Sequence, residues 1–187
     1  MKRKSIFILG LSCFGNMVVG TFLSSVIVFS LGLFSEHVWL QVIVQTLTLI
    51  LFSYLPYSQA WKAGDRDNNY VRFDRVPEDL FRGVKAGLVA SIPYGCMLVM
   101  LIVGKVIGSD LCLLLYKIGN IYLLPILNAI HLEPEIMGLS WGQVAAYGIF
   151  SLLPLILVSV GYLLGYKQIM LTEKLVFINQ TKNNTKR

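Results

Sequence analysis

The sequence predicts an all-α, polytopic integral membrane protein with four transmembrane helices and one outer-face helical segment that is interfacial or re-entrant. Hydrophobic residues make up 56% of the 187 residues and charged residues only 14%, whereas soluble domains carry about 25% charged residues. The charges are also clustered, which leaves long uncharged stretches that must be kept out of water. This composition excludes a disordered chain, a collagen, a coiled coil and a disulfide-stapled secreted domain.

The membrane spans follow from the length of the uncharged stretches. A hydrocarbon core of about 30 Å needs about 20 apolar residues in a helix, because every backbone polar group must be paired internally. The first stretch is longer than one upright span requires, so we expect it to tilt or to extend beyond the core. Pro93 and Pro154 lie inside the last two spans and are expected to bend them. The predicted spans are residues 5–34, 38–60, 86–106 and 143–166.

The orientation is predicted by the basic residues, which concentrate on the cytoplasmic side of membrane proteins. Of the 16 Lys and Arg residues, all except Lys105 and Lys117 precede the first span, lie in the segment 61–85, or follow the last span. With four spans, both termini and the segment 61–85 are therefore predicted to be cytoplasmic. Residues 1–170 would form a single transmembrane bundle, and residues 171–187 a basic cytoplasmic tail.

The outer segment, residues 107–142, contains the stretch 111–130, which is apolar enough to resemble a fifth span. It also holds Lys117, Asn120, Pro125 and Asn128. A fifth crossing would place the basic tail outside, against the orientation rule, so we reject it. The stretch is either an interfacial helix broken near the proline or a re-entrant hairpin covered by the other helices.

Small residues recur every four positions in the third span and again in the last one. Helices in a membrane associate through close packing of this kind, because lipid tails are as apolar as the side chains themselves. We therefore predict helix-packing surfaces, used inside the bundle or between copies. The predicted helix-packing residues are Gly83, Gly87, Ser91, Gly95, Gly104, Gly108, Gly161 and Gly165.

The second span carries a polar face made of Gln41, Gln45 and Thr48, at spacings of four and three residues. These side chains either form hydrogen bonds between helices or line a polar path. The sequence places no Asp, Glu, Lys, Arg or His deep inside the four predicted spans. Proton-coupled carriers and pumps generally need such a residue, so they are disfavoured.

The segment 61–75 is dense in residues that form turns and hydrogen bonds, and we predict a loop that faces lipid or a partner. Asp65 and Asp67 alternate as in a calcium-binding loop, but Tyr70 and Val76 stand where an EF-hand requires Gly and Glu. An ion-paired turn at the headgroup level is favoured, and a weak divalent site remains an alternative. The residues of this candidate loop are Trp61, Lys62, Asp65, Arg66, Asp67, Arg72 and Arg75.

Three stretches carry a resemblance to known sequences: WKAGDRD at 61–67, RGVKAGL at 82–88 and GYLLGYK at 161–167. With these stretches, the chain from Ala60 onward resembles a loose group of small, uncharacterised polytopic membrane proteins of Gram-positive bacteria. The resemblance implies a bacterial cytoplasmic membrane protein with a shared helical bundle, and it brings no activity.

The function that these features favour is that of a non-catalytic membrane scaffold or accessory subunit. Its partners would be the lipid bilayer and another membrane protein, or a second copy of itself, while its basic excess follows from topology and needs no nucleic acid. A small oligomeric transporter or pore is the alternative. The sequence contains no catalytic, cofactor or metal-binding motif. For chemistry, only His37 and His131 near Glu36, Glu133 and Glu135 would be worth mutating.

Overall fold

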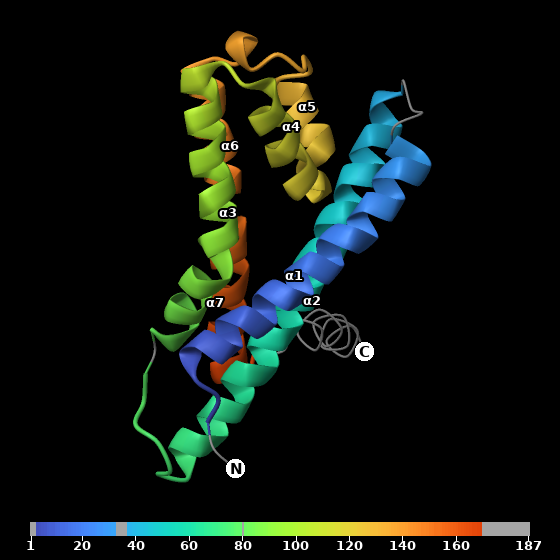
Figure 1. Cartoon of the computed structure of the whole chain (residues 1–187). Helices are drawn as coiled ribbons and strands as arrows, with labels where there is room; N and C mark the ends of the chain where they lie inside the picture. The colour runs from blue at the N-terminus through green and yellow to red at the C-terminus, as the bar shows by residue number, and fades with distance from the viewer. Residues whose placement is uncertain (1–2, 33–36, 80, 170–187) are drawn as a thin grey trace, which may run out of the picture.

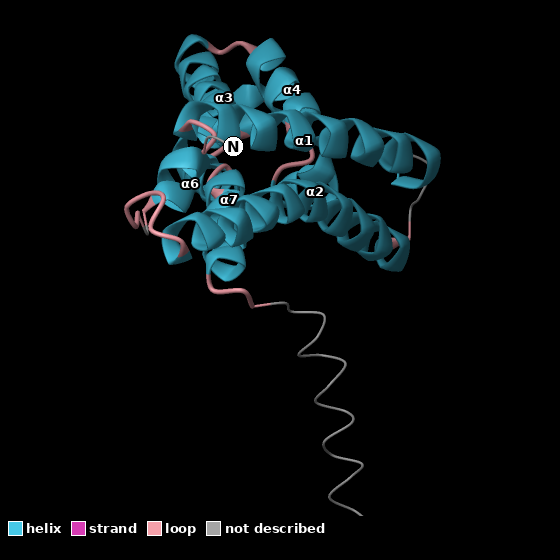
Figure 2. Cartoon of the chain, turned by 90° about the horizontal axis from the view of Figure 1, so that it is seen from below, coloured by secondary structure: helices cyan, strands magenta, loops and turns pink. Residues whose placement is uncertain are grey.

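The computed structural model describes residues 3–32, 37–79 and 81–169, and within these ranges all regular structure is helical (Figure 2). Among these residues, four helical segments are long and apolar enough to cross a membrane, and a bent helix pair accompanies them. This confirms the predicted fold class. The predicted tail, 171–187, lies outside the described residues. The four segments are Ile6–Leu31, Val38–Arg72, Arg82–Ile107 and Trp141–Tyr166.

Two of the four segments contain an irregularity. The first consists of α1 (Ile6–Ile27) followed by a π-helical turn, η1 (Val28–Gly32). The last consists of α6 (Trp141–Phe150) and α7 (Leu153–Tyr166), interrupted just before Pro154, which lies in the first turn of α7. A proline cannot donate a backbone hydrogen bond, so it is suited to a first turn. Pro93, in contrast, lies inside the continuous helix α3 (Arg82–Ile107).

Helix α2 (Val38–Arg72) is longer than the sequence suggested. At about 1.5 Å per residue its 35 residues span about 52 Å, against about 30 Å of hydrocarbon. The prediction that a loop begins at Trp61 was therefore wrong, because the chain stays helical as far as Arg72. Helix continues there because Ala63, Gly64 and Asp67 are buried on one face, and tertiary packing outweighs the weak helix propensity of Gly, Asp and Asn.

The helices form two groups that diverge along the molecule (Figure 1). Helix α1 packs on α2, and α3 packs on α7, while α2 and α7 also contact each other extensively. Near the N-terminus the two groups are joined; we call this the termini end. Towards the opposite end they separate, and a hairpin made of α4 and α5 lies in the space between them (Figure 1). We call that the hairpin end.

The hairpin consists of α4 (Asp110–Gly119), a short 3-10 turn η2 (Ile121–Leu123) and α5 (Leu124–Ile130), bent by 85°. It starts after the end of α3 and leads into η3 (Ile136–Gly138), which packs back on α3. The hairpin thus begins and finishes at the same end of the bundle. The bent pair thus folds back between the other helices, which is the geometry of the predicted hairpin alternative (Figure 1).

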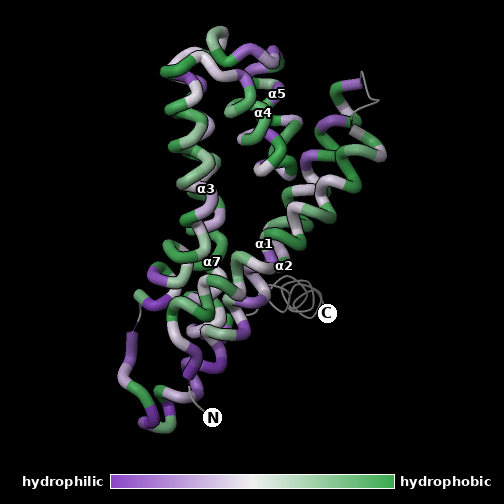
Figure 3. The backbone as a smooth tube through the Cα atoms, viewed as in Figure 1, coloured by the Kyte–Doolittle hydropathy of each residue, from purple (hydrophilic) through white to green (hydrophobic). Residues whose placement is uncertain are grey.

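The tip of the hairpin reaches the middle of the bundle. The ring of Tyr122 stacks on Phe52 of α2 with 3.5 Å between ring centroids, and Tyr94 of α3 meets both rings edge-on. Hydropathy follows this geometry: apolar residues dominate the middle of the helices, and hydrophilic residues gather at the termini end (Figure 3). The hairpin therefore completes the core between the two diverging helix groups.

Candidate functional site

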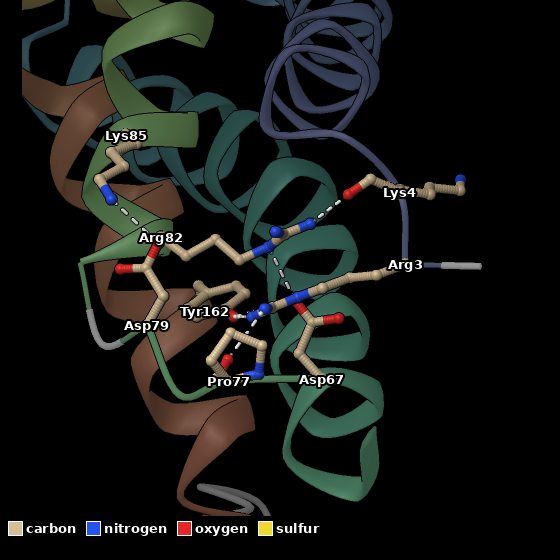
Figure 4. A network of polar contacts seen from close by, with 8 residues as sticks. All are labelled: Arg3, Lys4, Asp67, Pro77, Asp79, Arg82, Lys85 and Tyr162. Atoms are coloured by element: carbon tan, nitrogen blue, oxygen red, sulfur yellow. Dashed lines mark hydrogen bonds and ion pairs between the residues drawn. The ribbon is translucent and has the colours of Figure 1, made fainter. Parts of the chain in front are cut away.

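A buried charged cluster joins four segments of the chain at the termini end (Figure 4). Its centre is Asp67 of α2, which is 1% exposed. The carboxylate oxygen Oδ2 accepts hydrogen bonds from Arg3 Nε at 3.1 Å and from the hydroxyl of Tyr162 at 2.9 Å. Arg82 Nε forms an ion pair with the same oxygen at 2.9 Å. One carboxylate thus holds the N-terminal segment, α3 and α7 against α2.

Further polar contacts surround the cluster. Arg82 also donates to the carbonyl of Lys4, and Arg3 donates to the carbonyl of Pro77 at 3.3 Å. Burial alone would lower the pKa of Arg3, but its hydrogen bonds to Tyr162 and Asp67 outweigh burial and the pKa is raised. These contacts fix the segment that links α2 to α3.

Two polar pairs lie at the rim of the same end. Lys85 Nζ lies 2.9 Å from Asp79 Oδ2, and this hydrogen bond lowers the pKa of the Asp79 carboxyl. The hydroxyl of Tyr166 donates to Glu78 at 2.9 Å. Both pairs are solvent-accessible and add to the ties between the linking segment and the helices.

The predicted ion-paired turn is not formed. Asp67 is neutralised by Arg3 and Arg82, not by Arg66, Arg72 or Arg75, because the intervening residues are helical. Asp65 instead accepts a hydrogen bond from Gln168 at 3.3 Å. The two carboxylates are two positions apart on a helix, where side chains point in very different directions. They therefore do not converge on a divalent ion. Among the described residues, no group of three or more His, Cys, Asp or Glu side chains could hold a metal.

The remaining residues of the candidate loop lie at the edges of this end. Trp61 donates its indole N–H to the carbonyl of Ile169 at 3.1 Å. Lys62, Arg72 and Arg75 are exposed, and the guanidinium of Arg75 lies over the ring of Phe73. These three basic residues are therefore accessible to lipid or to a partner, the contacts predicted for the loop, whereas Asp67 is buried.

The polar face of α2 holds the tip of the hairpin. Gln45 Nε2 and Thr48 Oγ1 each donate to the carbonyl of Tyr122, both at 3.0 Å. Gln45 Oε1 accepts from the backbone N–H of Ile126 at 3.2 Å. Backbone polar groups in a membrane must be satisfied inside the protein, and these side chains provide the partners. Gln41 is exposed and lines two small cavities beside Pro125 and Ala129.

The hairpin carries its own buried polar side chains. Lys117 Nζ donates to the carbonyl of His131 at 2.8 Å, and Asn120 bonds to the carbonyl of Tyr116 at 3.0 Å. The imidazole of His131 lies 3.0 Å from the carbonyl of Glu135. His37 lies instead at the start of α2, stacked on Trp39. His131 thus contacts the segment after the hairpin and His37 the start of α2, and Glu36 lies outside the described residues.

Glycines at the α2–α7 crossing allow the two backbones to touch. A Cβ atom added at Gly165 would lie 2.0 Å from the carbonyl oxygen of Trp61, and one at Gly161 would lie 2.9 Å from that of Tyr57. Both were predicted as packing residues. Gly64 of α2 was not among the predicted packing residues, yet a Cβ added there would lie 2.1 Å from the carbonyl oxygen of Tyr162.

The predicted glycine ridge of α3 is used only in parts. Gly83 and Gly87 contact α7, and Gly104 contacts Cys112 of α4. Ser91 bonds to the carbonyl of Leu88 in its own helix, and Gly108 caps α3 with a φ of 78°. Gly95 packs on no other helix of this chain, since nothing lies within 4 Å of its Cβ position among the described residues, and its predicted use between copies stays a prediction. Helices that cross at an angle contact each other only over part of their length.

An apolar groove of about 460 Å³ opens between α1, α3 and the tip of the hairpin. Phe14, Val18 and Phe22 form its α1 wall, and Tyr94 and Met97 form its α3 wall. Gly119 and Ile121 of the hairpin close its base. The groove was not predicted, because it arises from the divergence of the helix groups.

Comparisons with protein-family models, with curated proteins and with solved structures found no match.

Proposed function

We propose that this protein is a non-catalytic membrane component that binds a transmembrane helix of another membrane protein in the groove between α1, α3 and α4. The observation that carries the proposal is the groove itself, which is apolar and lies halfway along the spans. Its α1 wall includes the small residues Thr21 and Ser25. Small residues are what helix–helix interfaces in membranes use, whereas contact with lipid tails does not require them.

A glycine on the same face of α1 supports a helical occupant. Gly15 lies one turn before Val18 and two turns before Phe22, so the three share a face. Nothing lies within 4 Å of its Cβ position among the described residues, whereas Gly10 and Gly20 of the same helix are packed. Gly15 is thus available for the close approach of a second backbone.

The alternative, a small oligomeric transporter or pore, has less support. The side chains that could line a polar path, Gln45 and Thr48, are hydrogen-bonded to the hairpin tip. Their bonds favour a structural role. Flux of ions or small solutes through vesicles that contain only this protein would favour the pore over the proposed helix-binding role.

The helix-binding proposal predicts that Gly15→Leu weakens partner binding at least tenfold, because the added side chain fills the site of closest approach. Gly95→Leu is the matched control. It adds the same bulk to an open position of α3. Pro93 and Met97, which line the groove, are each two residues away, or about 200° around the helix axis, so position 95 faces away from the groove. The measurement is photo-crosslinking from Val18, followed by quantification of the protein that co-purifies in mild detergent.

Three outcomes would contradict the proposal. The wild-type chain could purify as a solitary monomer. The two leucine variants could bind alike. The cross-linked species could be a second copy of the chain, which would make the groove a homo-oligomer interface.

We further propose that the protein lies in a bacterial cytoplasmic membrane with its termini end in the cytoplasm. The support is the concentration of basic residues at that end, the feature by which membrane proteins orient. In intact cells, Lys167→Cys is expected to resist an impermeant thiol reagent, and Glu133→Cys at the hairpin end is expected to react. Labelling of the cysteine at position 167 from outside the cell would show that the orientation is opposite to the one proposed.

A further inference from the structure

We propose that a pocket beside the start of α1 binds a phosphate group carried by an anionic lipid headgroup. The pocket has a volume of about 180 Å³. It lies between the N-terminal segment and α2, and the cationic side chains of Lys4, Lys62 and Arg66 line it. No Asp or Glu is among the lining residues. The inference is independent of the proposed function.

Three cations at the termini end are paired with carboxylates. Arg3 and Arg82 share the carboxylate of Asp67, and Lys85 pairs with Asp79. Within the described part of the chain, Lys4, Lys62 and Arg66 form no ion pair. Three like charges that converge on one pocket repel each other. A bound anion would remove that repulsion.

The geometry of α2 explains why the charges converge. Gln59, Lys62 and Arg66 are spaced three and four residues apart, so they share one face of the helix. Arg66 Nε is buried and has no hydrogen-bond partner among the described residues. An unsatisfied buried donor of a charged group is costly. A phosphate oxygen is the acceptor that a guanidinium prefers.

The depth of the pocket favours a lipid as the source of the phosphate. Lys4 is the last charged residue before the apolar stretch of α1, and Lys62 is the first after that of α2. Just inside the pocket, Gln59 Nε2 donates to Ser12 at 2.9 Å, and Leu9 is buried. The site therefore lies at the boundary between charged and apolar residues, where lipid headgroups reside.

The test measures retention of phosphatidylglycerol by the full-length protein in mild detergent, using native mass spectrometry. The double variant Lys62→Gln/Arg66→Gln is expected to bind this lipid at least about tenfold more weakly, because charge-assisted hydrogen bonds to the phosphate are lost. The matched control, Arg72→Gln/Arg75→Gln, removes the same charge from the same end but outside the pocket. It is expected to bind as the wild type does.

Two further variants and one competitor complete the test. Lys62→Arg/Arg66→Lys keeps both charges and is expected to retain the lipid, which separates a loss of binding from a loss of fold. Excess inorganic phosphate that displaces the lipid would assign the pocket to soluble phosphate, and its failure to do so assigns it to the headgroup. The proposal would be overturned if the two double glutamine variants lost lipid binding equally. It would also be overturned if Lys62→Gln/Arg66→Gln bound the lipid as tightly as the wild type.

Discussion

Replacing Asp67 by alanine is expected to destabilise the folded protein by about 3–5 kcal/mol, the usual cost of removing one partner of a buried ion pair. The carboxylate is 1% exposed, and its partner Arg82 is 7% exposed. Without Asp67, the guanidinium groups of Arg3 and Arg82 would remain close together and largely buried with no counter-charge. Thermal unfolding of the protein in detergent, followed by circular dichroism, measures the change.

The control for this prediction is Asp79→Ala. Asp79 pairs with Lys85 at the same distance, 2.9 Å, but the lysine side chain is about half exposed, at 52%. Exposed ion pairs contribute about 0–1 kcal/mol because water and salt screen them. A similar loss of stability in the two variants would show that the Asp67 cluster does not hold the bundle together.

The second large effect is expected at the α2–α7 crossing, where Gly165→Ala should destabilise by about 3 kcal/mol or more. The new methyl group would lie 2.0 Å from the carbonyl oxygen of Trp61. Overpacking usually costs about 1–3 kcal/mol, but here the neighbour is backbone, so relief requires the two helices to move apart. Gly64→Ala, at 2.1 Å from the carbonyl oxygen of Tyr162, should behave in the same way.

Where a glycine faces open space, replacing it by alanine is expected to stabilise the protein and not to destabilise it. Alanine is about 1 kcal/mol more favourable than glycine inside a helix. Gly95→Ala meets nothing within 4 Å among the described residues, so it should leave the stability unchanged or raise it slightly. Unfolding temperatures of the two alanine variants, measured side by side, give the comparison. Equal effects at positions 95 and 165 would contradict the tight crossing.

The apolar spans could be predicted from the sequence because the requirement is local: a helix must bury about 20 consecutive residues. For residues 111–130 the sequence left two alternatives, an interfacial helix or a covered hairpin, since Lys117 and Asn120 cannot face lipid without a covering partner. The end of α2 at Arg72 could not be predicted from the sequence. Gly64 and Asp67 look like turn residues, and only their burial against α7 and the N-terminal segment makes them helical.

The charged cluster could not be predicted for a different reason. Asp67 lies 64 residues from Arg3 and 95 from Tyr162 in the sequence. Nearby arginines such as Arg66 and Arg72 seemed the natural partners, but a helix turns them away from the carboxylate. Pairings of this kind depend on how the helices are arranged, which no local pattern specifies.

The cluster around Asp67 also sets an order for biogenesis. Arg3 is synthesised long before Tyr162, yet both bond to the same carboxylate. Helices insert as they are synthesised, but this contact can close only once α7 has joined the bundle. A nascent chain that stalls before α7 therefore lacks the hydrogen bond from Tyr162 to Asp67, and its Gly64 has no α7 backbone to pack against.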